Sequence, residues 1–268
     1  MRTFKDKVAV ITGAASGMGR ATARALAREG VHVVVADIHD ERAAETAAMV
    51  EACGVAALVV HCDVGEAADI AALRQAAIDR FGRVNILMNN AGVLPVGSIE
   101  DLPPVAWERT MRINFHSVVL GVQTFLADLR AADEAHIVNT ASYAGLISYG
   151  TDTLAYNASK AAVVSLSEGL AVYLRPRGIG VTCLCPGPVT TNIREQITLH
   201  GEMPEALGTF AVKTSEGRTA DEVGAMVVAA IRANRFLLPT DERMLDQIRD
   251  HGADPEGFIG RIIEVNGS

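Results

Sequence analysis

The chain has 268 residues, 49% of them apolar, which is enough to bury the core of one large α/β domain or two small ones. Its 24 lysines and arginines and 32 aspartates and glutamates give a formal charge of −8, spread along the chain. This composition argues against a disordered chain, and the spread of charge argues against a nucleic-acid partner or a polybasic membrane-binding segment.

Targeting and metal-binding signals are also missing from the sequence. No apolar run reaches the roughly 20 residues that span a bilayer, and residues 1–7 are too polar for a signal peptide. We therefore expect a cytoplasmic protein with no membrane partner. The four cysteines have no CxxC spacing, and no two of the seven histidines have the spacing of a metal site, so we expect no catalytic metal. Cys183 and Cys185 are expected to point to one face of a strand as small core residues.

Short runs rich in valine and isoleucine alternate with longer segments of helical period, a pattern typical of βαβ units. Seven such runs are predicted strands: 8–12, 31–37, 56–62, 84–89, 136–140, 180–185 and 236–239. Several are almost continuously apolar, as strands covered by helices on both faces should be. Because crossovers are nearly always right-handed, we predict a Rossmann-type α/β fold with a doubly wound, seven-stranded parallel sheet.

We predict a single domain over residues 1–268, because no linker and no internal repeat divides the chain. Residues 190–217 are irregular and are predicted to form a substrate lid. Residues 240–268 form a C-terminal extension with helical apolar residues whose packing partner the sequence does not identify. The helix predicted over 154–174 is apolar around most of its circumference, which favours a homo-oligomer, a dimer or tetramer; the alternative is a covering element from the same chain.

A glycine-rich turn, Thr12-Gly-Ala-Ala-Ser-Gly-Met-Gly19, lies between the first predicted strand and the helix that follows it. Small residues there let the backbone approach a pyrophosphate, and the helix N-terminus offers unpaired N–H groups. Such a turn occurs in many folds, but its place between strand and helix predicts a dinucleotide site. We expect cofactor contacts from Gly13, Ser16, Gly17, Met18 and Gly19.

Asp37 ends the second predicted strand, 24 residues after Gly13, near the spacing of a carboxylate that binds the adenosine ribose. Its charge would repel a 2′-phosphate, and no basic residue occurs in residues 38–40, so we predict NAD rather than NADP as the cofactor. The alternative is a strand-end or helix-capping aspartate, although Asp40 is the better candidate for the cap. Arg20 is the residue able to weaken the preference for NAD.

Tyr156 and Lys160 are four residues apart on the predicted helix and therefore share a face. A phenol with a pKa of about 10 is a poor acid or base at neutral pH. A nearby ammonium, joined by the positive charge of an oxidised nicotinamide, stabilises the phenolate and lowers that pKa. The alternative is an ordinary surface pair.

Three further polar elements follow strand ends or interrupt a helix. Ser142 follows the fifth strand and can polarise a substrate oxygen at the carboxyl edge of the sheet, where ligands bind in open α/β folds. Asn89-Asn90-Ala91-Gly92 reaches the same edge, where it can brace the site or touch the adenosine. Asn114 lies in a helical segment over 107–129, either in a distortion that holds a water or facing solvent.

Taken in order, these residues resemble the short-chain dehydrogenase/reductase family over roughly residues 5–239. Residues 12–19 are similar to its TGxxxGxG loop, Asp63-Val64 to its adenine contact, residues 89–92 to its NNAG element, and Pro186-Gly-Pro-Val-Thr-Thr191 to its PGxVxT nicotinamide turn. Asn114, Ser142, Tyr156 and Lys160 fall in the order of its catalytic tetrad.

The resemblance implies that the protein interconverts a secondary alcohol and a ketone by hydride transfer to or from the nicotinamide. It implies that Tyr156 is the acid/base, that Lys160 orients the ribose and lowers the tyrosine pKa, that Ser142 steadies the reacting oxygen, and that Asn114 anchors a proton-relay water. The further cofactor contacts that it implies are Asp63, Val64, Asn90, Ala91, Gly92, Pro186, Gly187, Val189 and Thr191. One departure is the distance from Ser142 to Tyr156, which is 14 residues, one more than the commoner family spacing; Tyr149-Gly150 also replaces a frequent Pro-Gly.

Apolar residues of the predicted lid and of neighbouring strand ends suggest an apolar pocket: Ile193, Ile197, Leu199, Met203, Leu207, Phe210, Val93, Leu94 and Leu146. Such a pocket suits an alicyclic, aromatic or steroid-like secondary alcohol, unless these residues only fold the lid onto the body. A 3-oxoacyl thioester reductase is the rival activity, and Asp37 and the negative net charge argue against it. A non-catalytic NAD-sensing protein is a third possibility, against which the intact Ser142, Tyr156 and Lys160 argue.

Overall fold

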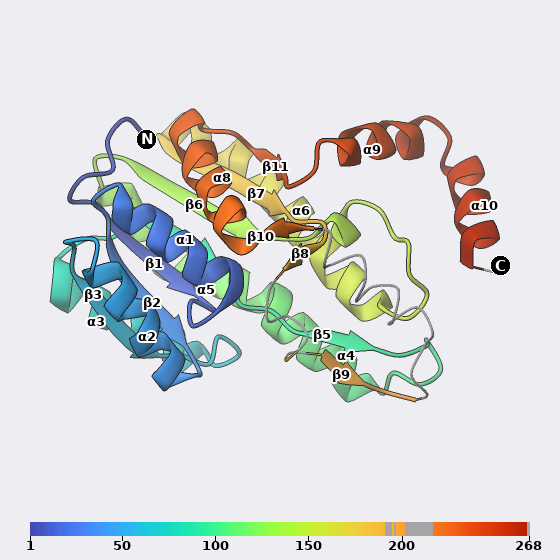
Figure 1. The fold of residues 1–268 in the computed structure, drawn as a ribbon, viewed down its shortest axis with the longest axis horizontal. Helices are drawn as coiled ribbons and strands as arrows, with labels where there is room; N and C mark the ends of the chain where they lie inside the picture. Colours follow the sequence, from blue (N-terminus) through green and yellow to red (C-terminus); the bar gives the residue numbers. More distant parts are fainter. Residues whose placement is uncertain (191–194, 196, 202–216, 267–268) are drawn as a thin grey trace.

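The computed structural model describes residues 1–190, 195, 197–201 and 217–266. Its centre is a seven-stranded sheet with the strand order β11-β7-β6-β4-β1-β2-β3, in which every pair of neighbours is parallel (Figure 1). The strands are β1 (Val8–Thr12), β2 (His32–Asp37), β3 (Ala57–His61), β4 (Ile86–Asn89), β6 (Ala135–Thr140), β7 (Ile179–Cys185) and β11 (Leu237–Pro239). The predicted fold class is confirmed, and each strand bound lies within two residues of its prediction.

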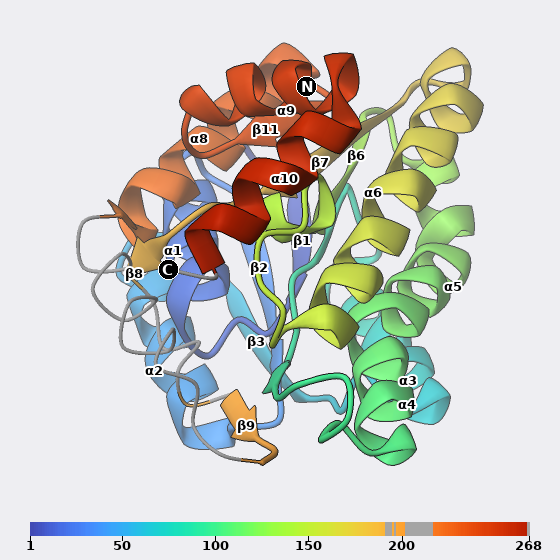
Figure 2. The same ribbon diagram turned by 90° about the vertical axis from the view of Figure 1, so that its right-hand side faces the viewer.

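Helices cover both faces of the sheet, as Figure 2 shows. One layer contains α1 (Gly17–Arg28), α2 (Asp40–Glu51) and α8 (Ala220–Ala233), and the other contains α3 (Ala67–Phe81), α5 (Ser117–Ala131) and α6 (Leu154–Leu174). In β1, Ala9 and Ile11 belong to the core on the first face, whereas Val8 and Val10 belong to the core on the second. Because successive side chains of a strand alternate between faces, a run apolar at every position is buried on both.

The carboxyl ends of the strands meet at one edge of the sheet, and the order of the strands reverses between β1 and β4. In open α/β sheets ligands bind outside the carboxyl ends at such a reversal. The turn after β1, the end of β4 and the end of β6 all reach this edge. The fold therefore places the glycine-rich turn, the NNAG element and Ser142 on the same side of the sheet.

The helix predicted over 107–129 consists of three consecutive parts. Between α4 (Pro104–Met111) and α5 lies a five-residue π-helix, Arg112–His116, which contains Asn114. The hydroxyl of Ser117 donates a 2.5 Å hydrogen bond to the carbonyl of Ile113 where the regular helix resumes. A π-helical turn is rare and occurs frequently at functional sites, so the distortion considered from the sequence is present.

Two small sheets, two 3₁₀ helices (Tyr143–Gly145 and Arg175–Arg177) and two terminal helices complete the described structure. β5 (Leu94–Val96) pairs with β9 (Ile197–Leu199), and β8 (Val189–Thr190) pairs with β10 (Arg218–Thr219). These pairs were not predicted, because strands of two or three residues are too short to show the alternation of apolar and polar residues that indicates a strand. After β11 the chain continues through α9 (Arg243–Ala253) and α10 (Pro255–Asn266) to the C-terminus at one end of the molecule (Figure 1).

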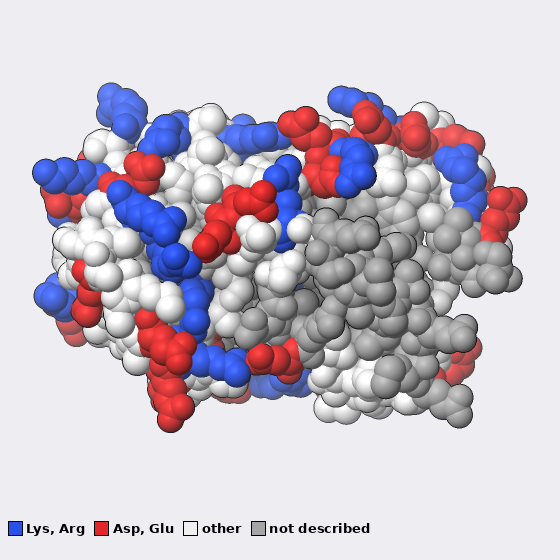
Figure 3. Space-filling model, viewed as in Figure 1, with Lys and Arg blue, Asp and Glu red and all other residues white. Residues whose placement is uncertain are grey.

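Charges of both signs are interspersed on the face that carries α1, α2 and α8 (Figure 3). Several of them are paired: Arg20 with Glu45 at 2.9 Å, and Arg24 with Asp221 at 3.1 Å. Exposed pairs of this kind contribute little to stability. Among the helices described here, none combines the length and the apolar character needed to cross a bilayer.

Candidate active site

The glycine-rich turn after β1 depends on residues without side chains. Gly13 and Gly17 have φ of 63° and 52°, in the left-handed region that glycine adopts without steric cost. A Cβ at Gly19 would lie 2.2 Å from the carbonyl oxygen of Gly13, so the first turn of α1 packs directly on the loop. Ser16 is the N-cap of α1, and its side chain makes no capping bond in the described structure. The N–H groups of the first turn, at Met18 among others, are therefore available to an anion.

Asp37 lies at the end of β2 with both carboxylate oxygens turned toward backbone N–H groups. One oxygen accepts a hydrogen bond from the amide of Ala15 at 2.9 Å and the other from the amide of His39 at 3.1 Å. The first bond ties the carboxylate to the glycine-rich turn. Each oxygen retains a further lone pair, so the same carboxylate can accept bonds from ribose hydroxyls.

Two expectations about the neighbours of Asp37 have different outcomes. Asp40 is not the cap of α2, because the N-cap is His39; Asp40 instead binds the imidazole of His61 at 2.9 Å, and this partner comes from β3, beyond the reach of a local pattern. The guanidinium of Arg20 is held by Glu45 and by the hydroxyl of Thr46 at 3.0 Å. Arg20 is thus engaged with α2.

Asn90 braces the site across three strands. Its Nδ2 donates hydrogen bonds of 3.1 Å to the carbonyls of both Thr12 and Gly13, and its Oδ1 accepts one of 3.3 Å from the hydroxyl of Thr140. The amide of its neighbour Ala91 donates a 3.3 Å hydrogen bond to the hydroxyl oxygen of Thr12. Of the two roles considered for this element, bracing is the one that these contacts display.

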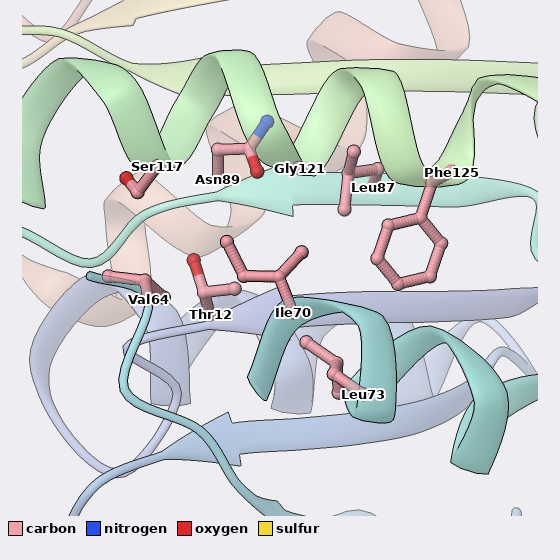
Figure 4. Close-up of a pocket in the computed structure, with 9 residues that line it drawn as sticks. All are labelled: Thr12, Val64, Ile70, Leu73, Leu87, Asn89, Ser117, Gly121 and Phe125. Carbon is pink, nitrogen blue, oxygen red and sulfur yellow. The ribbon is translucent and has the colours of Figure 1, made fainter. Parts of the chain in front are cut away.

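Asp63 and Val64 follow β3 at the expected adenine end. Asp63 accepts a 2.8 Å hydrogen bond from the amide of Gly65, which shapes the turn, and Val64 is buried. Val64 also borders a cavity of about 10 Å³ inside the core between β1, β4, α3 and α5 (Figure 4). This volume is at the lower limit for one water molecule, so the cavity is an internal void and too small for a substrate.

Ser142, Tyr156 and Lys160 come together at the carboxyl edge of the sheet. The hydroxyl of Ser142 lies near enough to that of Tyr156 to lower the pKa of the phenol, and Nζ of Lys160 lies 5.7 Å from the centre of the tyrosine ring. Lys160 is only 3% exposed, and its Nζ donates a 2.8 Å hydrogen bond to the carbonyl of Thr140. The alternative of an ordinary surface pair is therefore wrong.

Burial shapes the acid–base behaviour of this group. It raises the pKa of Tyr156 above its ordinary value, while the hydrogen bond from Ser142 lowers it. Burial lowers the pKa of Lys160 to about 8, against the opposing effect of the thiols of Cys183 and Cys185. Those thiols lie 3.6 Å apart on one face of β7 and are fully buried, as expected of core cysteines. The phenol therefore needs additional positive charge nearby before it can act as a base at neutral pH.

Asn114 is fully buried, which excludes the solvent-facing alternative. Its Oδ1 accepts a 2.8 Å hydrogen bond from the amide of Val93, and its Nδ2 donates bonds of 3.0 Å to the carbonyl of Val93 and to the hydroxyl of Ser159. Ser159 in turn donates to the carbonyl of Tyr156 at 2.7 Å. The π-helix is thus tied to the helix that carries Tyr156. Gly92 leaves room for this junction, since a Cβ there would lie 3.3 Å from Oδ1 of Asn114 and 3.5 Å from Nζ of Lys160.

The turn after β7 lies beside Ser142. The carbonyl of Pro186 accepts a 2.9 Å hydrogen bond from the amide of Tyr143, and the amide of Gly187 donates one of 3.0 Å to the hydroxyl of Thr240. Val189 is buried. Of the other predicted residues, Thr191, Ile193, Met203, Leu207 and Phe210 lie outside the described residues, whereas Ile197 and Leu199 form β9 on β5.

Sequence reasoning missed three residues that hold the site together: Thr12, Thr140 and Ser159. Each uses a hydroxyl or carbonyl to position one of the predicted residues. Thr12 and Thr140 end β1 and β6, and Ser159 precedes Lys160, so their positions beside the motifs could have marked them as candidate site residues. Their hydrogen-bond partners are 20 to 79 residues away in sequence, and those partners cannot be identified from the sequence.

Known proteins resemble this chain in both sequence and structure. The profile of the short chain dehydrogenase family matches residues 7–201. The 2-(S)-hydroxypropyl-CoM dehydrogenase 3 of Xanthobacter autotrophicus is 35% identical over 228 residues, 84% of this chain and 89% of that protein. The 3-alpha-(or 20-beta)-hydroxysteroid dehydrogenase of Mycobacterium tuberculosis is 36% identical over 225 residues, 83% and 81% of the two chains.

Solved structures agree with these relatives. A short-chain dehydrogenase/reductase from Burkholderia phymatum in complex with NAD superposes with a TM-score of 0.87 at 34% identity, over 96% of each chain. A short chain dehydrogenase from Burkholderia cenocepacia in complex with NADP gives a TM-score of 0.79 at 27% identity, over 90% of this chain and 98% of that one. The chain belongs to the short-chain dehydrogenase/reductase family of oxidoreductases, enzymes that bind a nicotinamide cofactor.

Proposed function

We propose that this enzyme is an NAD-dependent dehydrogenase/reductase that interconverts a secondary alcohol and a ketone. The observation that carries the proposal is the placement of the Ser142 hydroxyl and the buried Lys160 ammonium beside the phenol of Tyr156. A hydroxyl donor and a titratable phenol side by side can hold one substrate oxygen and move its proton.

In alcohol oxidation, the phenolate of Tyr156 takes the proton of the substrate hydroxyl while the hydroxyl of Ser142 donates a hydrogen bond to the same oxygen. In ketone reduction, Tyr156 returns the proton. Lys160, fixed by its bond to Thr140, supplies the positive charge that favours the phenolate and orients the cofactor ribose. Asn114 is proposed to anchor the water that relays the proton to solvent. When bound, the nicotinamide supplies the hydride acceptor or donor.

The residues present fit a dinucleotide. The glycine-rich turn has no Cβ at Gly13, Gly17 or Gly19, and the start of α1 offers N–H groups without a side-chain cap, so this end would hold the pyrophosphate. Asp63 and Val64 would contact the adenine, and Asn90, Ala91 and Gly92 would flank the ribose. The turn with Pro186, Gly187, Val189 and Thr191 would contact the nicotinamide, and Tyr156 and Lys160 its ribose.

The proposed preference for NAD rests on the charges around Asp37. Two described arginines near Asp37 are paired with other carboxylates, Arg20 with Glu45 and Arg42 with Glu195. Among the described residues around this position, a 2′-phosphate would be repelled by the carboxylate of Asp37, and the charges of Arg20 and Arg42 are already partly neutralised by their partners. The Burkholderia phymatum neighbour was crystallised with NAD, which supports the proposal, whereas the Burkholderia cenocepacia neighbour was crystallised with NADP.

We further propose an apolar substrate, an alicyclic, aromatic or steroid-like secondary alcohol. Val93 and Leu94 are buried directly after the NNAG element, and Leu94 pairs with Ile197 of β9. A hydroxysteroid dehydrogenase and levodione reductase, the latter with a TM-score of 0.79 at 29% identity, are among the similar proteins, which supports cyclic substrates.

One relative favours a second candidate, the thioester class. The (2S)-[(R)-hydroxy(phenyl)methyl]succinyl-CoA dehydrogenase subunit BbsD of Thauera aromatica is 35% identical over 194 residues, 72% of this chain and 77% of that protein. A 3-oxoacyl thioester reductase is therefore retained as the alternative substrate class.

A substrate panel tests the function and separates the two classes. Initial rates with NAD are compared for cyclic secondary alcohols, 3-hydroxyacyl-CoA thioesters, sugars and hydroxy acids, with Tyr156→Phe as the matched control. We expect the cyclic alcohols to give the highest kcat/KM and Tyr156→Phe to lower it by about 10²-fold or more. NADH binding without turnover of any substrate would favour a sensor, and faster turnover of sugars or hydroxy acids would reject the apolar site.

We also propose a homo-oligomer that uses the outer face of α6. Near the C-terminal end of this helix, Val172 is 75% exposed and Tyr173 is 47% exposed, so large apolar surface is open to a partner. Light scattering coupled to size exclusion would detect a dimer or tetramer. The four free cysteines fit a reducing compartment, and a cytoplasmic location is proposed on that ground.

A further inference from the structure

The C-terminal helices contact the site at two points, and the first is the turn after β7. Met244, in the first turn of α9, is 4% exposed. Its terminal methyl carbon lies where a side chain on Gly187 would be, since a Cβ there would come within 1.9 Å of it. α9 is therefore packed against the backbone of the proposed nicotinamide turn.

The second contact is with the segment that follows Ser142. Gln247 lies three residues after Met244 and so on the same face of α9. Its Oε1 accepts hydrogen bonds from the hydroxyls of Tyr143, at 2.5 Å, and Tyr149, at 3.0 Å, and the two hydroxyls also contact each other. One amide oxygen thus holds both ends of the turn between β6 and α6.

α10 reinforces this contact from outside. The ring of Phe258 lies 6.0 Å from that of Tyr149 and meets the ring of His251 edge-on at 5.2 Å. Phe258 is only 7% exposed, so its ring is buried in this contact with Tyr149 and His251. Aromatic pairs at such distances add stability beyond that of the area they bury.

The two segments that α9 contacts, the turn after β7 and the segment after Ser142, are also hydrogen-bonded to each other. The amide of Tyr143 donates a 2.9 Å hydrogen bond to the carbonyl of Pro186. On its other side the segment is pressed against α6, because a Cβ at Gly145 would lie 2.5 Å from the carbonyl carbon of Lys160. The backbone that carries Ser142 therefore lies between α6 on one side and α9 on the other.

We propose that α9 is a clamp that fixes Ser142 relative to the nicotinamide turn, with Gln247 as its positioning residue and Met244 as its point of contact on the turn. The inference rests on the proposed function, because it assigns a role in the same reaction. Gln247 acts through Tyr143 and Tyr149, and no contact between Gln247 and the substrate is needed.

The clamp matters because the work of Ser142 depends on geometry. Displacing a reacting group by about 1 Å can cost about 10²-fold in rate. A freed turn would let the hydroxyl of Ser142 leave that of Tyr156. The hydrogen bond from Ser142 lowers the pKa of Tyr156, so losing it raises that pKa. The rate of alcohol oxidation, which requires the phenolate, would then rise with pH only at more alkaline values.

The test uses the full-length protein and three substitutions on α9. Gln247→Leu removes the acceptor, Gln247→Glu keeps one, and Arg249→Ala changes an exposed residue of the same helix that pairs with Asp246. For Gln247→Leu we expect kcat to fall about 10-fold, the pH profile of alcohol oxidation to move to higher pH as in Ser142→Ala, and the Kd for NADH to stay within about twofold. Gln247→Glu should retain most of the rate, and Arg249→Ala should match the wild type.

A second measurement does not depend on turnover. Hydrogen exchange of the amides in residues 142–149 should be faster in Gln247→Leu than in the wild type and unchanged in Arg249→Ala. Unchanged exchange, or an unchanged kcat and pH profile in an active enzyme, would overturn the clamp. Absence of any wild-type turnover would instead count against the proposed function, and the exchange measurement would still decide on the clamp.

Discussion

Nζ of Lys160 donates a hydrogen bond to the carbonyl oxygen of Thr140, the last residue of β6, at 2.8 Å. The ammonium is almost fully buried, and this bond holds it on the face of the tyrosine ring. A side chain with four flexible torsions is thereby fixed beside the phenol, on the strand that delivers Ser142. The hydrogen bond thus fixes the position of the positive charge relative to the sheet and to Tyr156.

Lys160→Met keeps an unbranched side chain one atom shorter than lysine and removes the charge. We expect kcat/KM for alcohol oxidation to fall by about 10²-fold or more, because the phenolate of Tyr156 loses the cation that stabilises it. The remaining activity should increase toward higher pH than in the wild type. Steady-state rates from pH 6 to 10 measure both effects. An unchanged pH profile would show that Lys160 does not influence the phenol.

Asp37→Asn keeps hydrogen-bond acceptance and removes the negative charge. We expect the ratio of the Kd for NADPH to that for NADH to fall about 10-fold, equivalent to about 1.4 kcal/mol, because the repulsion of the 2′-phosphate is lost. Fluorescence titration with each reduced cofactor measures the ratio. Arg24→Ala, which removes an arginine of α1 that pairs with Asp221 of α8, is the matched control and should leave the ratio unchanged. Equal ratios in wild type and Asp37→Asn would reject the charge argument.

Asn114→Ala removes three hydrogen bonds from a buried junction. The amide and carbonyl of Val93 and the hydroxyl of Ser159 lose their partner, which should lower the free energy of unfolding by about 1–3 kcal/mol. Because Ser159 binds the carbonyl of Tyr156, we also expect kcat to fall while the Kd for NADH changes little. Urea denaturation and single-turnover rates separate the two effects. A stability loss with unchanged kcat would make Asn114 a purely structural residue.

We expect His136 to lower the free energy of unfolding in acid. The imidazole is buried in β6, where burial foremost, then the N-terminal ammonium and Arg175, lower its pKa to about 3. In the unfolded chain the pKa is about 6.5, so between these values the unfolded state binds the extra proton, and stability falls as pH falls from about 6.5 to 3. At pH 5 the loss from this group is about 2 kcal/mol relative to pH 8.

The measurement is urea unfolding at pH 8 and pH 5, with His136→Gln as the comparison. Glutamine keeps a polar group toward Thr182, whose hydroxyl lies 2.8 Å from Nε2 of the imidazole, and does not titrate. The difference in unfolding free energy between the two pH values should be smaller in the variant. An equal difference in both proteins would remove His136 as the cause.

Predictions from the sequence succeeded where a pattern is complete within a few residues. The seven strands of the sheet are short runs rich in apolar residues, and the helix predicted over 154–174 has the bounds that the structure gives α6. The glycine turn between β1 and α1 was also predicted from its sequence motif. The pairs β5–β9 and β8–β10 were not predicted, because each joins strands of two or three residues about 30 to 100 positions apart.

The order of the motifs in the chain was enough to predict the site residues, but the hydrogen-bond partners of these residues could not be predicted. Asp40 was assigned to a helix cap from its position, and it binds His61 because β2 and β3 are paired there. The C-terminal extension could be recognised as helical, yet its contacts with Gly187 and Tyr143 follow only from the folded chain.

The strands and helices, the glycine turn and the residue types at the carboxyl edge follow from the order of residues in the chain, because backbone geometry and hydrophobic periodicity act over neighbouring residues. The burial of Lys160 against Thr140, the junction that Asn114 makes between two helices, and the packing of α9 on the segment after Ser142 arise only when the chain folds. Burial and hydrogen-bond partners depend on segments far apart in the chain, and these meet only when the whole core is packed.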